Sequence, residues 1–461
     1  MSKKLKLFWE AIKGEEKDYT TVSIKQAIFL LAVPMMLEMS GEALFALVDT
    51  YFVAQVGPLA VATIGFTETI MTLVYSLAIG ISAAATAMVA RRIGEKKREE
   101  ANITAFQVIL LGLIISFTLG IVGFYFAEDI LAMIGASEEV ISSGVGYTKI
   151  MFATNVVIMM LFLLNGIFRG AGNASIAMWS LWVANIINII LDPCFIFGWG
   201  PFPAMGVEGA AVATSVGRGL GVLFQLYILF FGGGILTLLR KHIRIRLAII
   251  TRLIRIAVGG TFQFIIASAS WIFLMRIVAE FGSNVVAGYV IAIRLLIFTI
   301  LPSWGMANAA ATLVGQNLGA GQPERAEKSV WETAKYNMLF LLTVSIIYAA
   351  FAPLLIGVFS SDPEVIASGI LSLRIISAGY VFFAYGMVVG QAFNGAGDTF
   401  TPTLLNFIAF WLLEIPLAYT LSTIFEWGPT GVYVAVAISE SILAVLCIIV
   451  FRRGKWKLVE V

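Results

Sequence analysis

Apolar runs of about 20 residues or more recur along the whole chain and are separated by short polar segments. Runs of this length are typical of helices that span a bilayer, whereas a membrane β-barrel shows shorter segments in which apolar and polar residues alternate. A helix in lipid satisfies its own backbone hydrogen bonds. We therefore predict an all-α membrane protein with twelve transmembrane helices, at residues 27–55, 59–88, 103–127, 140–165, 175–198, 207–232, 256–281, 284–313, 331–358, 364–389, 400–424 and 431–451.

The composition supports a membrane location. Of the 461 residues, 60% are hydrophobic and 13% are charged, and the mean hydropathy is +0.94, whereas roughly 25% of the residues of a soluble domain are charged. The two cysteines, Cys194 and Cys447, fall in apolar runs, so the sequence favours neither a disulfide framework nor a metal site made of cysteines.

The distribution of lysine and arginine predicts the orientation of the chain. One face of the predicted membrane protein carries 25 of the 30 cations, at residues 1–25, 90–100, Arg169, 240–255, 325–335 and 452–457, and the loops of the other face carry none. Cytoplasmic loops are enriched in lysine and arginine. We therefore expect a multi-pass protein of the plasma membrane with both termini in the cytosol.

An internal repeat divides the chain into two halves. The segment "FVAQVGPLAVA" (52–62) returns as "IVAEFGSNVVA" (277–287), and "GISAAATAMVARRIG" (80–94) returns as "GMANAAATLVGQNLG" (305–319). Both pairs have the same offset in the numbering, 225, which we call the repeat interval. We predict two pseudo-symmetric six-helix lobes, at 1–232 and 256–461, with a cytosolic linker at 233–255. Because each lobe has an even number of helices, the lobes have the same orientation, which is a geometry of secondary transporters with a central cavity.

Three motifs within this arrangement resemble a known family. The segments "PMMLEMSGEALFALVDTYFVAQVG", "LVGQNLGAGQPERA" and "GVEGAAVAT" are similar to those of the multidrug and toxic compound extrusion (MATE) family, over essentially the whole chain and most closely in its DinF-like prokaryotic branch. The resemblance implies an antiporter that exports bulky organic cations in exchange for H⁺ or Na⁺. It implies no cofactor beyond this coupling ion.

Carboxylates inside predicted spans are the main candidates for function, because an ionisable group in lipid costs several kcal/mol. Asp49 lies about 12 Å below the outer end of its helix, and the outward-running helix 175–198 brings Asp192 to the outer half. Glu68 and Thr214 lie roughly 12–14 Å below the outer face. Asn185, Asn188 and Asp192 have the spacing of one helix face. We expect these polar groups to share one depth in the N-terminal lobe.

The repeat helps to separate functional acids from structural ones. Asp49 and Glu68 correspond to Leu274 and Ile293. Asp192 corresponds to Leu417, or to Ile415 if the prolines of "LDP" and "EIP" are aligned, so these acids do not recur. We interpret Asp49 and Asp192 as a functional pair, with a buried structural hydrogen-bonded pair as the alternative, and for Glu68 a polar clamp between helices stays open. Lys149 recurs as Arg374, which predicts a role in the fold.

The resemblance assigns further roles. In the DinF-like pattern, Asp49, Asn188, Asp192 and Thr214 match an ion-responsive network, and the same four residues are the candidates for binding Na⁺. We expect Asp49 to anchor its helix to helix 175–198 through Asn188 and Asp192, and Pro34 to act as a hinge. Phe45 stands where relatives can have a tyrosine. Glu38 and Glu42 form a ladder below Asp49 that either lines the cavity or takes part in coupling.

Two rival functions and several weaker candidates remain open. A lipid-linked oligosaccharide flippase of the same superfamily would show a cationic cavity, for which Arg276 and Arg294 are candidates, whereas an intramembrane enzyme would need catalytic motifs that the sequence does not show. Glu414 and Glu440 face the cavity or pair with arginines. The expected partners are small organic cations and membrane lipid, with no nucleic acid, and we expect a monomer that is not an enzyme.

Overall fold

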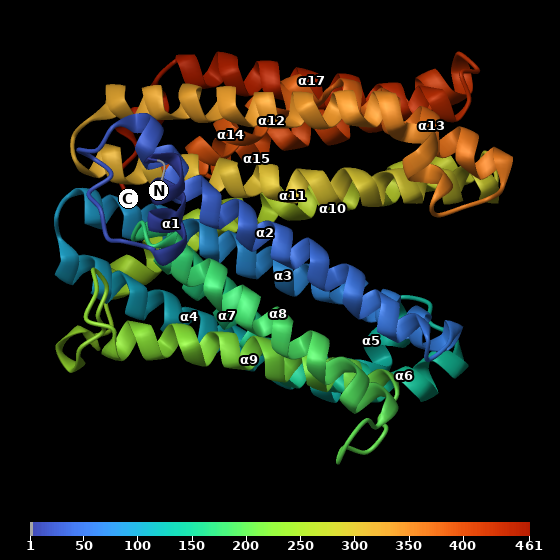
Figure 1. Cartoon of the computed structure of the whole chain (residues 1–461), viewed down its shortest axis with the longest axis horizontal. Coiled ribbons are helices and arrows are strands. Elements are labelled where there is room, and N and C mark those ends of the chain that lie inside the picture. The colour runs from blue at the N-terminus through green and yellow to red at the C-terminus, as the bar shows by residue number, and fades with distance from the viewer. Residues whose placement is uncertain (1–2) are drawn as a thin grey trace.

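The computed structural model describes residues 3–461, and within this range the chain forms helices and no strand (Figure 1). The N-terminal half contains α1 (Lys3–Lys13), α2 (Ile24–Ala54), α3 (Pro58–Gly94), α4 (Arg98–Tyr125), α5 (Ala127–Met133), α6 (Glu138–Ala153), α7 (Asn155–Gly170), α8 (Ala174–Phe197) and α9 (Val207–Phe231). The short η1 (Arg240–His242) follows, before the second half begins.

The C-terminal half contains α10 (Leu247–Ala279), α11 (Ser283–Gly319), α12 (Pro323–Gly357), α13 (Pro363–Ala378), α14 (Tyr380–Ala396), α15 (Phe400–Asn406), η2 (Phe407–Glu414), α16 (Ile415–Tyr419), η3 (Thr420–Ile424), α17 (Pro429–Arg452) and η4 (Lys455–Leu458). In the described part of the chain ten spans are long and apolar enough to cross a membrane, and two bent helix pairs bring the number to twelve. The predicted all-α architecture of twelve helices in two lobes is confirmed.

The helix boundaries differ from the prediction in two ways, because some predicted helices are bent and others are longer than predicted. Two predicted single helices are bent pairs, since α6 and α7 meet at 42° and α13 and α14 at 55°. α3, α11 and α12 also extend beyond the predicted ranges, and α10 begins at Leu247, inside the predicted linker. The extensions of α3 and α11 contain polar residues and glycines and are largely buried where the two lobes meet, so the apolar pattern does not include them. The pattern also missed the short α1 and α5.

The repeat is visible in the helices themselves. α11 begins and ends one repeat interval after α3, and α13 begins and ends one repeat interval after α6. The residues at the two bends, Thr154 and Gly379, are separated by the same interval.

Cations recur at equivalent places in the two lobes. Lys149 lies 5.9 Å above the ring of Phe124, and Arg374 donates a hydrogen bond of 3.0 Å to the carbonyl of Ala349. Arg374 follows Lys149 by one repeat interval, and Ala349 follows Phe124 by the same interval. Both cations therefore tie the same pair of helices in each lobe.

The two lobes meet at one end of the molecule. Figure 1 shows the N-terminal and C-terminal lobes close together at the end where both termini lie, and diverging toward the other end. We call the first end the termini end. There Thr312 Oγ1 of α11 donates to the carbonyl of Arg169 at 3.1 Å, and Gln316 Nε2 donates to the carbonyl of Gly170 at 3.0 Å. Arg91 also bonds Ala396 across the interface.

Candidate transport site

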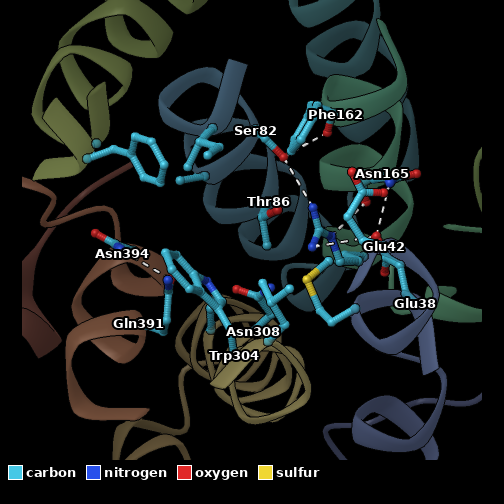
Figure 2. A pocket seen from close by; sticks show the side chains of 18 of the residues that line it. Glu38, Glu42, Ser82, Thr86, Phe162, Asn165, Trp304, Asn308, Gln391 and Asn394 are labelled. Carbon is cyan, nitrogen blue, oxygen red and sulfur yellow. Dashed lines mark hydrogen bonds and ion pairs between the residues drawn. The ribbon is translucent and has the colours of Figure 1, made fainter. Parts of the chain in front are cut away.

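A cavity of ≈ 320 Å³, partly open to solvent, lies between the two lobes. Its N-terminal wall carries charged side chains, namely Glu38, Glu42, Arg169 and Arg218. Its C-terminal wall carries the amides Gln263, Asn308, Gln391, Asn394 and Asn406 beside Trp304 and Phe264. Figure 2 shows the two walls facing each other, with the Gln391 and Asn394 pair opposite Glu38 and Asn165. The cavity is therefore charged on one side and neutral on the other.

Glu38 and Glu42 lie one turn apart on α2 and so face the same way. Glu38 is fully buried, accepts a hydrogen bond of 2.9 Å from Asn165 Nδ2, and lies 3.8 Å from the Arg169 guanidinium. Gln225 in turn donates to the Asn165 side-chain oxygen. The N-terminal wall around Glu38 is therefore a connected polar network that contains one carboxylate, Glu38, and one arginine, Arg169.

Arg218 pairs with the second carboxylate of this ladder. Its Nη2 donates a hydrogen bond of 2.9 Å to Glu42 Oε1, and its guanidinium lies 5.0 Å from the centre of the Phe45 ring. A cation over an aromatic face is stabilised by the ring quadrupole. Phe45, which has no hydroxyl, therefore supports Arg218 through its ring face.

Three of the four residues predicted to form the ion-responsive network are joined by hydrogen bonds. The amide of Asn188 on α8 donates to Asp192 Oδ1 and to Thr214 Oγ1 of α9, both at 3.2 Å. Asp192 is fully buried, and its Oδ2 has no partner, nor does the side-chain oxygen of Asn188. The network therefore keeps oxygen atoms free for a proton or a cation.

Asp49 lies near this network but is not bonded to it. Its carboxylate acts electrostatically on Asp192, and Glu68 and Arg218 act on it in turn. Its buried Oδ1 has no partner, and in residues 3–461 no hydrogen bond joins it to Asn188 or Asp192. The expectation that Asp49 anchors α2 to α8 by hydrogen bonds is thus wrong for this conformation.

Other side chains join these two helices. Asn185 Nδ2 donates to the carbonyl of Gly41 at 2.9 Å, and Trp182 Nε1 donates to the carbonyl of Leu37 at 3.2 Å. Asn185 therefore lies below the ion-responsive network and holds α8 against α2. Because both bonds end on backbone carbonyls, they do not depend on the protonation of Asp49.

Glu68 lies on α3 with an exposed side chain. Its charge interacts electrostatically with those of Asp49 and Arg218. Within the described residues, however, its carboxylate has no hydrogen-bond or ion-pair partner. A polar clamp between helices would need such a partner. Two further groups of the same region, the hydroxyls of Tyr75 and Tyr147, interact electrostatically with Glu68 and Asp49.

The donor set fits a monovalent cation as well as a proton. Asp49, Asp192, Asn188 and Thr214 offer carboxylate, amide and hydroxyl oxygens, the ligands that hard cations prefer. Three of these oxygens are buried without a partner. In the described chain no group of three or more histidine, cysteine, aspartate or glutamate side chains is arranged to hold a metal ion.

Pro34 lies inside α2, which continues through it as one helix from Ile24 to Ala54. The neighbouring Met35 carbonyl packs against Gly305 of α11, where an added Cβ atom would lie 2.4 Å from the carbonyl oxygen. Because Pro34 lacks a backbone N–H, one helical hydrogen bond is missing where α2 touches the other lobe. The position suits a helix that bends against a fixed neighbour.

Arg169 and Arg218 are site residues that the sequence pattern did not single out. The pattern places Arg169 in a cytosolic loop, but it belongs to α7, is buried, and lines the cavity. Arg218 lies in the middle of the apolar run 207–232, where an ionisable side chain is as costly as Asp49 is in its own span. The pairing with Glu42 was not predictable, because it depends on how α2 and α9 pack.

Comparisons with known proteins agree with this architecture. The family model MatE matches residues 34–194 and 261–420. A "Probable multidrug resistance protein NorM" of Thermotoga maritima is 27% identical over 94% of this chain and 93% of its own length, and a "FAD transporter" of Shewanella oneidensis is 26% identical over 93% and 95%. A solved structure described as an outward-facing conformation of a multidrug resistance MATE family transporter has a TM-score of 0.90 and 26% identity, and the alignment covers 96% of this chain and 98% of that chain.

Proposed function

The chain belongs to the MatE family, and from this membership we propose that it is a secondary active antiporter that exports organic cations in exchange for H⁺ or Na⁺. Relatives named as multidrug resistance proteins support drug-like cargo. The cavity volume of ≈ 320 Å³ falls within the range of ligand pockets, about 300–1,000 Å³. The amide and aromatic wall of the C-terminal lobe suits varied substrates, because it offers stacking and adaptable hydrogen bonds.

The charge balance of the N-terminal lobe is the observation that carries the proposal. Five carboxylates (Glu38, Glu42, Asp49, Glu68 and Asp192) share this region with two arginines (Arg169 and Arg218). With every group ionised the region would carry a net charge of −3. A low-dielectric site with this excess attracts cations, and an organic cation, a proton or Na⁺ can each neutralise part of it.

An anionic cargo is less well supported, although one relative is named a FAD transporter. The arginines that reach the cavity are engaged, because Arg169 lies by Glu38 and Arg218 is bonded to Glu42. They therefore offer no free positive charge to a pyrophosphate, which also disfavours a flippase for lipid-linked oligosaccharides. Arg276 and Arg294 have exposed side chains and do not line the cavity.

An enzymatic function has no support in the site. The single histidine, His242, lies in η1 between the two lobes, and burial lowers its pKa. The relatives with assigned activities are transporters. We therefore infer transport without catalysis, by a monomer surrounded by lipid in the plasma membrane.

We assign the termini end to the cytosol, because lysine and arginine concentrate there. The lobes touch at that end and diverge toward the other (Figure 1), so the conformation is outward-facing. In this state the half of the lobe that carries Asp49, Asp192 and Glu68 faces the external side. Their protonation, or Na⁺ binding, would lower the negative charge and release a cationic cargo outward.

The bend at Pro34 would link this charge change to movement. Neutralising Asp49 changes its repulsion with Glu68 and Asp192, and α2 is already missing a hydrogen bond beside Pro34. A ligand shifts a two-state balance only by its differential affinity. The outward state must therefore hold the proton or Na⁺ more tightly than the inward state loaded with cargo.

Binding of fluorescent probes to the purified protein tests the cargo class. Ethidium should bind, and lowering the pH from 8 to 6 or adding Na⁺ should weaken its binding, because proton or Na⁺ and cargo compete for one negative region. FAD, a fluorescent anion, should not bind. Binding of FAD without binding of ethidium would overturn the proposal in favour of an anion transporter.

A further inference from the structure

The C-terminal lobe contains two carboxylates that no part of the proposed site uses. Glu414 ends η2 and is 3% exposed, and Glu440 lies within α17 and is half-buried. Glu414 is ten residues before the end of its span and Glu440 eleven residues after the start of α17, which places both roughly 15 Å below the outer end. A charged group at the middle of a bilayer costs several kcal/mol and marks a functional position.

Within the described residues no cation pairs with either carboxylate. Arg276, Arg294 and Arg374 of the same lobe have exposed side chains, and Arg374 is bonded to the Ala349 carbonyl. Among residues 3–461, neither carboxylate takes part in a hydrogen bond or an ion pair with another side chain. Glu440 acts electrostatically on Glu414, and no charged side chain of α10, α13, α14, α15 or α16 acts on either.

A shift of the helix register explains how Glu414 reaches this position. Asn185 donates to the carbonyl of Gly41, and in the second lobe Trp411 donates to the carbonyl of Ile266. Ile266 follows Gly41 by one repeat interval, whereas Trp411 follows Asn185 by one residue more than that interval. The π-helix η2 (Phe407–Glu414) accommodates the extra residue, and such one-turn widenings occur frequently at functional sites.

With this register, Glu414 occupies the place that Asn188 has in the first lobe. Asn188 packs against Gly217 of α9, and because α9 begins at Val207 and α17 at Pro429, the residue of α17 equivalent to Gly217 is Ser439. The Ser439 hydroxyl is fully buried and has no partner. The second lobe therefore places Glu414 where the first lobe has the amide of its ion-responsive network.

A second buried hydroxyl without a partner lies beside the pair. Tyr289 of α11 is fully buried, its hydroxyl is unbonded, and Glu414 acts on it electrostatically. Its ring stacks on that of Tyr433 at 5.7 Å, and the Tyr433 hydroxyl is bonded to Ser368. Besides these tyrosines, the remaining titratable group near the pair is the Cys447 thiol, which interacts with Glu440.

We propose that Glu414 and Glu440 form a second proton-binding site, in the C-terminal lobe. Two membrane-embedded carboxylates without a cation are neutralised by taking up a proton, and the Tyr289 and Ser439 hydroxyls can bond the protonated carboxyl group and its ionised neighbour. The first lobe, by contrast, neutralises part of its charge with arginines. A role of this proton in transport rests on the proposed antiport function, but its binding does not.

Infrared difference spectroscopy of the full-length protein, between pH 6 and pH 9, tests the proposal directly. The intensity of the carbonyl-stretch band of protonated carboxylic acids should fall by the contribution of one carboxyl group in Glu414→Gln or in Glu440→Gln. The loss should be absent in the control Glu426→Gln, which removes an exposed carboxylate. The signal of this pair should persist in the double variant Asp49→Asn/Asp192→Asn, so the result does not depend on transport.

Labelling of the unaltered protein provides a second measurement in case a variant does not fold. Dicyclohexylcarbodiimide adds to protonated carboxyl groups in apolar surroundings. The acid oxygen bonds the carbodiimide carbon and the proton moves to nitrogen, after which the acyl group shifts to nitrogen. Peptide mass mapping should find the label on Glu414 or Glu440 and should find less of it as the pH rises. An unlabelled pair at every pH, or an infrared signal unchanged in both variants, would overturn the proposal.

Discussion

The guanidinium of Arg218 donates a hydrogen bond of 2.9 Å to the carboxylate of Glu42, and this ion pair joins α9 to α2 in the middle of the N-terminal lobe. Arg218 is buried, and it also acts on Asp49 and Glu68. The pair therefore lies between the cavity and the outer carboxylates. A change in the charge of Asp49 therefore alters its electrostatic interaction with Arg218, the same arginine that is bonded to Glu42 of α2.

Breaking this pair should destabilise the protein. Arg218→Met leaves the Glu42 carboxylate without its cation, and we expect a loss of about 2 kcal/mol, below the ~3–5 kcal/mol of a fully buried pair because Glu42 is partly exposed. The double variant Arg218→Met/Glu42→Met should recover most of this loss. Melting temperatures of the single and double variants check the coupling, and a double variant as unstable as the sum of its parts would contradict it.

Removing the titratable charge of the outer carboxylates should abolish export. Asp49→Asn and Asp192→Asn keep the shape of each side chain but cannot take up a proton, so neither variant should protect drug-sensitive cells against ethidium. Both should be expressed and folded, because the bonds that join α8 to α2 come from Asn185 and Trp182. Glu139→Gln, at an exposed position, is the matched control. A variant that still confers resistance would remove that residue from the mechanism.

The bend of α2 should depend on Asp49 and Pro34. Spin labels at the exposed positions Leu47 on α2 and Ile190 on α8 should show a distance distribution that differs between pH 8 and pH 6. Asp49→Asn should give the same distance distribution at both pH values. Pro34→Ala, which restores the missing hydrogen bond, should make the difference between the distributions at pH 8 and pH 6 smaller. If the unaltered protein shows the same distances at both pH values, the carboxylates form a binding site without a coupled movement.

The cations that recur in both lobes should contribute to stability and leave coupling intact. Lys149→Met removes a cation from the face of Phe124, and Arg374→Met removes the bond to the Ala349 carbonyl. Contacts of this kind are worth about 0.5–1 kcal/mol, so each melting temperature should fall by about 2 °C. Efflux of ethidium per folded molecule should stay near that of the unaltered protein. A loss of efflux without a change of melting temperature would reverse this assignment.

Much of the fold follows from local sequence pattern. Runs of apolar residues define the spans, and the constant repeat interval predicts the two lobes, because both signals depend only on residues that are neighbours in the chain or in the repeat. The bends at Thr154 and Gly379 interrupt runs that are apolar on both sides. The π-helix that moves Glu414 by one residue likewise becomes visible only through the bond of Trp411 to Ile266.

The candidate site was predictable only in part. An isolated carboxylate in an apolar run, such as Asp49 or Asp192, is visible in the sequence. The partners of these groups are set by the packing of helices far apart in the chain, so neither the pair of Arg218 with Glu42 nor the contact of Arg169 with Glu38 was predicted. Only the structure therefore shows whether a carboxylate is free or is neutralised by a neighbouring cation.

Transport by the purified protein in lipid vesicles tests the central claim most directly. Ethidium movement is measured with a pH gradient alone, with a Na⁺ gradient at clamped pH, and with neither. The account predicts movement against the ethidium gradient when an ion gradient is present, with the proton gradient expected to be the stronger driver, and no such movement in Asp49→Asn. Ethidium movement that is indifferent to both gradients, or that persists in Asp49→Asn, would contradict ion-coupled antiport through the N-terminal lobe.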